Sequence, residues 1–324
     1  MSKHIDVLLL LALPASGKSE ARRYLASLSP QECQDQFGIG HTVQLDDFPY
    51  VHIMRRVSDE LTARGHEGAF FVSPALPFRN SVDWLTLIEL INEDYEDLVA
   101  GNKPTPASAS LWLFDRMDAA RVRAGGEAVI GKLPEELRQE IAGPIEAEAR
   151  KLLDDKVAEV PDTLEGKTVV IEFARGCADG QTMPIPHPYG YAGSLGQLSP
   201  AILAKASILY IWVTPEESRR KNAARTDPND PGSILHHGVP LAVMYGDYGC
   251  DDMEYLLEQS AKPDTVQIDQ AGQSYFLPLG RFDNRVDKTS FIREDEDKWS
   301  PADVKALQDG MREAFDHLMR GREG

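Results

Sequence analysis

The stretch VLLLLALPASGKS, residues 7–19, begins with seven apolar residues and then turns small and polar. An apolar run without polar alternation is typical of a strand that is buried on both faces of a parallel sheet. We expect a helix to begin near Lys18 and to continue to about Leu28. The start of the chain therefore predicts a buried strand, a tight turn and a helix.

The turn in this stretch matches three of the four fixed positions of the phosphate-binding pattern G-x-x-x-x-G-K-[ST], with Ala12 in place of the first glycine. In such a loop, backbone N–H groups and the positive end of the following helix surround phosphate oxygens. Gly17 allows a close approach, Lys18 reaches the outer phosphates, and the Ser19 hydroxyl can bind Mg²⁺. An ordinary strand–turn–helix is the alternative. The predicted nucleotide contacts are Pro14, Ala15, Ser16, Gly17, Lys18, Ser19 and Glu20.

The chain of 324 residues is strongly acidic, with 34 Lys and Arg against 52 Asp and Glu and a formal net charge of −18. Such a field repels nucleic-acid backbones and anionic lipids, so we expect neither nucleic acid nor membrane as a partner. The apolar stretches fall short of the roughly 20 residues that a spanning helix needs. The three cysteines are far apart and form no C-x-x-C pair, which fits a reducing compartment. We therefore expect a cytoplasmic protein.

Strand and helix signals alternate along the chain and predict an α/β fold, a doubly wound and mainly parallel sheet of the P-loop NTPase type with a helical insertion. The predicted organisation is a first half of the core at 1–74, a helical insertion for substrate binding or a lid at 75–160, and a second half of the core at 161–324. We expect Gly143-Pro144 to break the last helix of the insertion. After the first strand, further strands are expected at residues 41–45, 167–173, 207–213, 265–268 and 274–279.

Two segments resemble P-loop kinases of small molecules. LLLALPASGKS at residues 9–19 is similar to the opening of nucleoside, nucleotide and sugar kinases. VQLDDF at residues 43–48 resembles the end of the second strand in the uridine kinase and phosphoribulokinase families. The resemblance covers about the first fifty residues. It implies a kinase that uses ATP and Mg²⁺ to phosphorylate a hydroxyl-bearing small molecule, with a nucleoside or a sugar as the implied acceptor.

The two acids of the second segment are the candidates for proton transfer. The resemblance makes Asp46 the first candidate for the base that receives the proton of the acceptor hydroxyl, and Asp47 the second candidate or a partner of Mg²⁺. A physical argument agrees, because an acid at the carboxyl end of a parallel strand beside the phosphate loop points into the ligand crevice. The alternative is that these acids cap the helix that begins near Pro49.

A further acid ends the third expected strand. Glu172 follows the apolar run VVI at residues 169–171, at the place where P-loop proteins hold Mg²⁺ or a water bound to it. We predict Ser19, Glu172 and Asp47 as metal ligands. A strand-edge charge that faces solvent is the alternative for Glu172. Arg175 is a candidate for binding a substrate anion.

A basic helix follows the fourth expected strand and begins with TPEE at residues 214–217, a capping box with proline in the first turn. It resembles the lid helix of P-loop kinases, in which arginines close over the transferred phosphoryl group. The resemblance implies Arg219 and Arg225 in this role, on a lid near residues 214–232. Guanidinium groups suit the task because they stay charged and donate paired hydrogen bonds to phosphate. The alternative is a solvated helix face whose bases pair with the neighbouring glutamates.

Three further segments are candidate ligand contacts. Asn284 follows the final strand, where the corresponding loop of many P-loop kinases contacts adenine. Trp84, Trp112 and Phe114 are candidates for an acceptor pocket, with ordinary helix core as the favoured interpretation. The segment YGDYGCDD at residues 245–252 either lines a substrate pocket or forms a turn.

The sequence thus favours an ATP-dependent phosphotransferase with a small-molecule acceptor. A nucleotide-binding regulator or scaffold without transferase activity is one alternative. A toxin-type kinase of a nucleotide-sugar or a protein is another. A closed, aromatic-lined acceptor cleft would favour a small molecule, and a shallow, open cleft would favour a protein. The acceptor, the preference for ATP over GTP and the oligomeric state stay open at this point.

Overall fold

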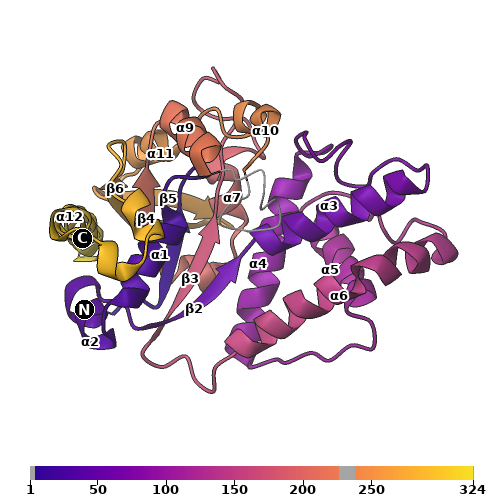
Figure 1. Ribbon diagram of the computed structural model, residues 1–324, viewed down its shortest axis with the longest axis horizontal. Coiled ribbons are helices and arrows are strands. Elements are labelled where there is room, and N and C mark those ends of the chain that lie inside the picture. The colour runs from indigo at the N-terminus through magenta and orange to yellow at the C-terminus, as the bar shows by residue number, and fades with distance from the viewer. Residues whose placement is uncertain (1–3, 226–237, 324) are drawn as a thin grey trace.

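A six-stranded sheet forms the centre of the computed structural model, which describes residues 4–225 and 238–323 (Figure 1). The strands lie in the order β2-β3-β1-β4-β6-β5, and β5 is antiparallel to β6 while the other neighbouring pairs are parallel. The predicted α/β class and mainly parallel sheet are therefore confirmed. The strands are β1 (Val7–Leu11), β2 (His41–Asp46), β3 (Lys167–Phe173), β4 (Ala206–Trp212), β5 (Thr265–Gln270) and β6 (Gln273–Asp283).

Helices make up most of the remaining described chain. The α-helices are α1 (Lys18–Ser27), α2 (Pro30–Phe37), α3 (Phe48–Ala63), α4 (Val82–Ala100), α5 (Ala109–Arg123), α6 (Glu135–Glu159), α7 (Gly190–Gln197), α8 (Pro200–Leu203), α9 (Pro215–Arg225), α10 (Leu241–Gly246), α11 (Met253–Gln259) and α12 (Pro301–Glu323). Two short 3₁₀ helices precede the last of these, η1 (Ser290–Arg293) and η2 (Glu296–Lys298).

Helices cover both faces of the sheet, as the apolar run of β1 predicts. Leu8 and Leu10 point to one face and pack in a core with residues of α1, α2 and α12. Val7, Leu9 and Leu11 point to the other face and pack with residues of α4, α7 and α8. Because each such buried leucine contributes about 2 kcal/mol, β1 is firmly held and fixes the position of the turn at its carboxyl end.

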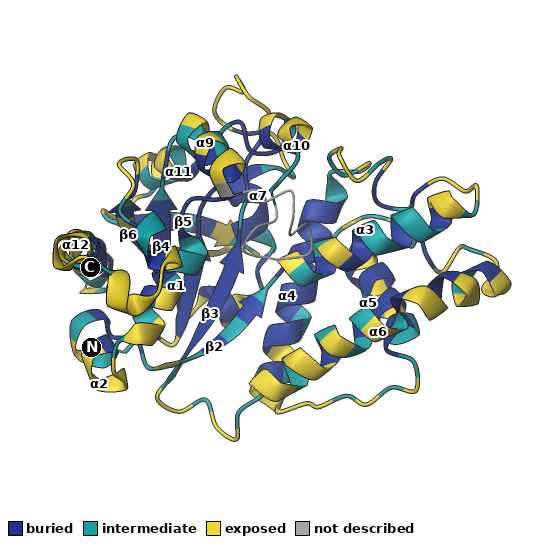
Figure 2. Cartoon of the chain, viewed as in Figure 1, coloured by how far each residue is buried: buried dark blue, intermediate teal, exposed yellow. Residues whose placement is uncertain are grey.

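Helices α3, α4, α5 and α6 lie together beside the sheet and share a core of their own (Figure 1). α4 joins this core to the sheet, because Leu87 and Leu90 belong to the helical core whereas Ile88 and Ile91 belong to the core under the sheet. It is accordingly buried on nearly all sides (Figure 2). This arrangement sets α3 and the start of α4 beside the carboxyl end of β2.

The predicted break at Gly143-Pro144 is wrong, because α6 continues through Pro144 without interruption. Ala142 and Ile145, on either side of the dipeptide, are buried in the helical core. A proline inside a helix costs about 3 kcal/mol, and the packing of these neighbours outweighs that cost. The rule that proline breaks a helix considers only neighbouring residues and does not include the stabilisation from packing in the helical core.

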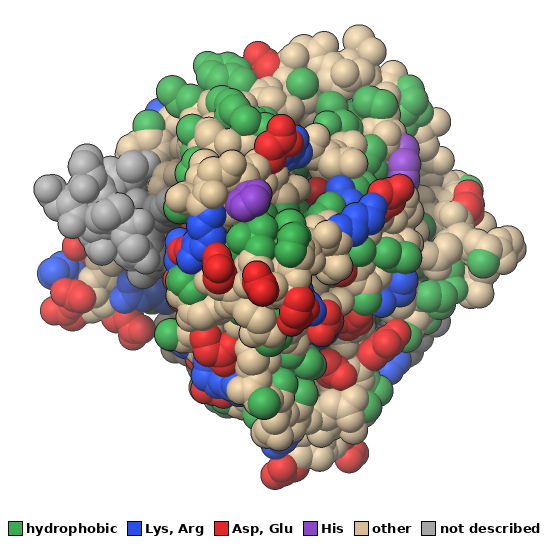
Figure 3. All heavy atoms as spheres, turned by 90° about the vertical axis from the view of Figure 1, so that its right-hand side faces the viewer, with side chains coloured by type: hydrophobic (Ala, Val, Ile, Leu, Met, Phe, Trp, Pro, Cys, Tyr) green, Lys and Arg blue, Asp and Glu red, His purple; other side chains and the backbone are tan. Residues whose placement is uncertain are grey.

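The outer surface of the helical region carries acidic and basic side chains that are interspersed (Figure 3). Arg56 illustrates the pattern, with its Nη2 2.8 Å from Glu60 and its Nε 2.9 Å from Glu148. Within the described part of the chain, no helix combines the length and the apolar character needed to cross a membrane.

Candidate functional site

The chain turns sharply between the end of β1 and the start of α1. Ala15 and Gly17 have left-handed backbone conformations, with φ of 57° and 108°. This conformation suits glycine but costs a residue with a Cβ about 1–2 kcal/mol, so the turn is strained at Ala15. Ala12 is not one of the residues with positive φ in the described chain, so alanine fits in place of the first glycine without strain.

Two buried side chains hold the carbonyl groups of this turn. Nδ2 of Asn284 donates a hydrogen bond of 2.8 Å to the carbonyl oxygen of Ser16. Oγ of Ser218, on α9, donates one of 2.6 Å to the carbonyl oxygen of Pro14. Asn284 and Ser218 are both fully buried. The expected adenine contact of Asn284 stays a prediction, and the structure places its amide under the loop as an anchor.

Close packing explains the glycine at position 17. A Cβ built on Gly17 would lie 2.6 Å from Oγ1 of Thr289, so a side chain here would displace the loop from the segment that anchors it. The next residue, Lys18, begins α1 and has its Nζ 3.3 Å from the carbonyl oxygen of Ala12. The result is a loop of fixed shape at a helix N-terminus, where unpaired N–H groups and the helix dipole favour an anion.

Asp46 and Glu172 lie opposite each other at the carboxyl ends of β2 and β3. Glu172 is buried, and its Oε2 lies 3.3 Å from Nε of Arg22 but accepts no hydrogen bond from the described residues. Burial, the charge of Glu172 and the charge of Asp47 raise the pKa of Asp46 from its ordinary value of 3.8 to about 7. A carboxyl with this pKa can take up and release a proton near neutral pH, as a general base must.

The capping alternative applies to Asp46 and not to Asp47. Oδ1 of Asp46 accepts a hydrogen bond of 2.8 Å from the N–H of Phe48, whereas Asp47, the N-cap residue of α3, makes no side-chain capping bond. Oδ2 of Asp47 instead accepts a hydrogen bond of 2.7 Å from Nη1 of Arg175, and both side chains are buried. Arg175 also donates to Ser194 at 2.8 Å. Arg175 is thus committed to the protein, and the expected anion-binding role finds no support.

A cavity of about 190 Å³ connects the loop to these acids. The predicted contacts Pro14, Ala15, Ser16, Gly17, Lys18, Ser19 and Glu20 all line it, as do Asp46, Asp47 and Glu172. The wall opposite the loop is formed largely by α3, the following segment, the start of α4 and the chain after α10. Its members include Arg55, Phe71, Phe78, Trp84, Asp247 and Tyr248.

Four aromatic rings form a continuous part of this opposite wall. Phe71 stacks on Phe78 with centroids 4.4 Å apart, and Phe78 meets the edge of Trp84 at 4.9 Å. Trp84 in turn meets Tyr248 at 5.8 Å. We call these four rings the aromatic wall. Of the three candidates for an acceptor pocket, only Trp84 lies here, since Trp112 lines a different cavity and Phe114 is fully buried in the helical core.

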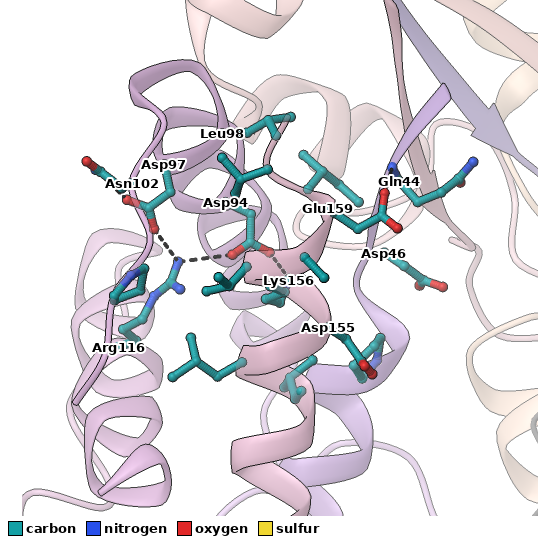
Figure 4. A pocket seen from close by; sticks show the side chains of 18 of the residues that line it. Gln44, Asp46, Asp94, Asp97, Leu98, Asn102, Arg116, Asp155, Lys156 and Glu159 are labelled. Atoms are coloured by element: carbon teal, nitrogen blue, oxygen red, sulfur yellow. Dashed lines mark hydrogen bonds and ion pairs between the residues drawn. The ribbon is translucent and has the colours of Figure 1, made fainter. Parts of the chain in front are cut away.

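That different cavity, of about 340 Å³, lies between β2 and helices α4, α5 and α6, and Asp46 lines both cavities. Arg116 and Lys156 converge on Asp94 from two sides (Figure 4). Nη2 of Arg116 is 3.1 Å from Asp94, which also accepts a hydrogen bond of 2.8 Å from the hydroxyl of Tyr50. Arg116 also pairs with Glu93 and Asp97, so the charged groups at the centre of this cavity are engaged in ion pairs. The loop at residues 14–20 does not line this cavity.

The structure does not bring the predicted lid arginine to the loop cavity. Arg219 lies on α9, pairs with Glu216 at 3.2 Å and has its guanidinium carbon 4.5 Å from the centre of the Tyr245 ring. The side chain of Arg225 and the rest of the expected lid, residues 226–232, lie outside the described residues. Arg219 and Arg220 pair with Glu216 and Glu217 as the alternative expects, but the side chain of Arg219 is largely buried and not solvated. Closure over a phosphoryl group stays a prediction.

The predicted metal ligands Ser19, Glu172 and Asp47 all line the loop cavity. In the described ranges, no group of three or more His, Cys, Asp or Glu side chains is placed to hold a metal ion alone. Mg²⁺ in nucleotide sites takes most of its ligands from phosphates and water and needs only one or two protein groups. Oε2 of Glu172 fits such a role, because it is buried and accepts no hydrogen bond from the described residues, although Arg22 lies 3.3 Å away.

Sequence reasoning found the loop half of the cavity and missed most of the opposite wall. Arg55 lies on an ordinary amphipathic helix, and Phe71 and Phe78 lie in a segment without regular structure, so no local pattern marked them. Three wall residues were among the candidates: Trp84 for an acceptor pocket, and Asp247 and Tyr248 in the turn-rich segment that was a candidate for a substrate pocket. Comparison of the chain with family models, with curated proteins and with solved structures found no match in any of the three.

Proposed function

We propose that this chain is a P-loop phosphotransferase, an ATP-dependent kinase that acts on a hydroxyl group of a small molecule. One observation carries the proposal: the loop at residues 14–20 and Asp46, with its pKa of about 7, line the same cavity. Phosphoryl transfer needs these two parts, a cradle for the phosphates and a group that receives the hydroxyl proton. The parallel sheet adds support, since ligands of such folds bind at the carboxyl ends of the strands.

The loop supplies the binding of ATP. The N-terminus of α1 and the ammonium group of Lys18 attract the phosphates, while Asn284 and Ser218 keep the loop in shape before the nucleotide arrives. Ser19 and Glu172 would hold Mg²⁺, which neutralises negative charge on the phosphates when bound. Asp47 would act through its Oδ1, because Arg175 occupies Oδ2.

Asp46 supplies the proton acceptor. In the proposed reaction, the acceptor oxygen forms a bond to the γ-phosphorus, the bond to the leaving ADP oxygen breaks, and Asp46 receives the hydroxyl proton. The pKa of about 7 keeps a large fraction of Asp46 ionised at neutral pH and still makes it basic enough to accept that proton. Arg219 would complete the site only after a movement of α9. Arg225 keeps its predicted role at the phosphoryl group.

The cavity favours a small-molecule acceptor over a protein. Aromatic rings line the cavity beside the acids, and an apolar lining with a few polar groups is typical of sites for small molecules. The proton acceptor also favours a transferase over a regulator, because a protein that only binds nucleotide has no use for a carboxyl group of raised pKa beside the phosphates.

Two substitutions test the proposal by calorimetric titration with Mg·ATP and by ADP release in the presence of hydroxylated metabolites. Lys18→Ala should abolish nucleotide binding, and Lys205→Ala, which changes an exposed lysine, is the matched control. Asp46→Asn should lower turnover at least a hundredfold while ATP affinity changes little. Unchanged ATP affinity in Lys18→Ala would refute the nucleotide site. Equal losses of turnover and affinity in Asp46→Asn would make Asp46 a structural or metal-binding residue.

A further inference from the structure

Asp247 places a buried carboxyl group in the wall opposite the phosphate loop. The residue is only 4% exposed, yet it lines the loop cavity. Its Oδ2 has no hydrogen-bond partner among the described residues. Buried polar atoms in folded proteins are almost always paired, and the exceptions concentrate where a ligand completes the pairing. Because Asp247 lines the cavity, a group that enters there can supply a partner for its carboxyl group.

The cations nearest to Asp247 do not neutralise it. Arg55 lines the same cavity, but no ion pair within 4.0 Å joins it to Asp247 in the described structure. Its guanidinium group instead donates to the carbonyl of Pro74 and lies 4.2 Å from the centre of the Phe71 ring. Burial raises the pKa of Asp247 to about 7, and the charge of Arg55 offsets this only in part.

The other titratable groups that face Asp247 add no positive charge. Tyr248 is its neighbour in the chain and a member of the aromatic wall, and Tyr189 and Cys177 approach from the segment after β3. Burial is the main cause that raises the pKa of Tyr189 and of Cys177, and the negative charge of Asp247 adds to it. Both groups are therefore neutral near pH 7 and supply no positive charge to Asp247.

We propose that the acceptor carries a protonated amino group in addition to its hydroxyl group, and that Asp247 binds this ammonium group against the aromatic wall. The assignment rests on the proposed function, because it concerns the acceptor half of the same cavity. It makes the substrate an amino alcohol. A neutral hydroxyl would satisfy the hydrogen bond of Asp247 but would not stabilise its ionised form, which burial disfavours.

The aromatic wall supports the choice of a cation. The faces of aromatic rings attract positive charge, and protein sites for ammonium groups commonly combine such rings with a carboxylate. Two rings of this wall already have a guanidinium group over one face, Phe71 with Arg55 at 4.2 Å and Trp84 with Arg175 at 5.0 Å. Two rings of the aromatic wall therefore already hold a positive charge in this fold.

Three ligands of nearly equal size separate the possible recognition modes: serinol has an amine, glycerol is neutral, and glycerate has a carboxylate. Each is titrated into the full chain by NMR or calorimetry, with and without a non-hydrolysable Mg·ATP analogue. We expect serinol to bind the wild type at least tenfold more tightly than glycerol, and glycerate to bind most weakly. In Asp247→Asn the preference for serinol should fall below about twofold. Asp154→Asn, an exposed aspartate on α6, is the matched control and should keep the preference.

Equal binding of serinol and glycerol, or an unchanged preference in Asp247→Asn, would overturn the assignment. If glycerate bound most tightly of the three ligands, the assignment would also be overturned, and Arg55 would be the group that recognises the acceptor through its carboxylate. If Asp247→Asn does not fold, Phe78→Leu replaces it, and the serinol preference should then decrease severalfold through loss of a ring. Titration without nucleotide keeps the two proposals apart: a serinol preference in a chain that binds no ATP would uphold the amine subsite and refute the kinase.

Discussion

Asp247→Asn should make the free protein more stable at alkaline pH while it removes a group that we place in ligand binding. Asparagine has nearly the same shape as aspartate but carries no charge. The carboxyl of Asp247 is buried, and its pKa is raised from an ordinary 3.8 to about 7 because burial penalises the ionised form. Folding at high pH must therefore bury a charge that water would otherwise solvate.

The size of the effect follows from this difference in pKa. The folded protein binds the proton more tightly than the unfolded chain, so stability from this group is highest below pH 4 and falls as the pH rises to about 7. Above pH 7 the full penalty of about 4 kcal/mol applies, from roughly three pKa units at 1.36 kcal/mol each. Between pH 5 and pH 8 the penalty grows by about 2–3 kcal/mol.

Urea unfolding of the wild type and Asp247→Asn at pH 5 and at pH 8 measures this growth directly. The amide of asparagine is neutral at both pH values, so its own packing and hydrogen-bonding costs cancel in the difference between them. We expect the variant to gain about 2–3 kcal/mol relative to the wild type on going from pH 5 to pH 8. Asp154→Asn should show no such gain. A difference near zero, or a loss, would refute the conclusion that Asp247 is buried without a partner.

Three further predictions follow from the loop, its base and α6. Asn284→Ala should lower the free energy of unfolding by about 2 kcal/mol, because it leaves the buried carbonyl of Ser16 without its hydrogen bond, and it should also weaken ATP binding. Urea unfolding measures the first effect and calorimetry the second. Unchanged ATP affinity would contradict the anchoring role. Turnover should rise with pH through about 7 as Asp46 loses its proton, and a flat pH–rate profile would remove it as the base. Pro144→Ala should raise thermal stability by about 1–2 kcal/mol, and a lower midpoint would show that the proline is needed in α6.

Local patterns were sufficient for the parts of the site that are contiguous in the chain. The apolar run of β1 required a strand covered on both faces, and Leu8 and Leu9 do point to opposite cores. The turn that follows has glycine where packing against Thr289 tolerates no Cβ. Asp46 ends its strand beside the loop, as an acid at the carboxyl end of a neighbouring parallel strand must.

The parts that sequence could not predict depend on contacts between distant segments. The Asn284 amide meets the Ser16 carbonyl across 268 positions, and no local rule distinguishes an anchor beneath the loop from an adenine contact above it. Asp47 was a candidate metal ligand on position alone, and its pairing with Arg175, 128 positions away, became visible only in the folded chain. The unbroken α6 has the same cause, because burial in the helical core outweighs a local preference.

The hydrogen bond from Ser218 to Pro14 has a mechanical consequence for α9. It ties the first turn of this helix to the loop at residues 14–20, and Arg219 is the very next residue. A movement of α9 that brings Arg219 toward the loop cavity must therefore pivot at Ser218 or move the loop together with the helix. If the loop binds a nucleotide as we propose, the contact of Arg219 with its phosphates and the closure of the loop around them would be one coupled motion.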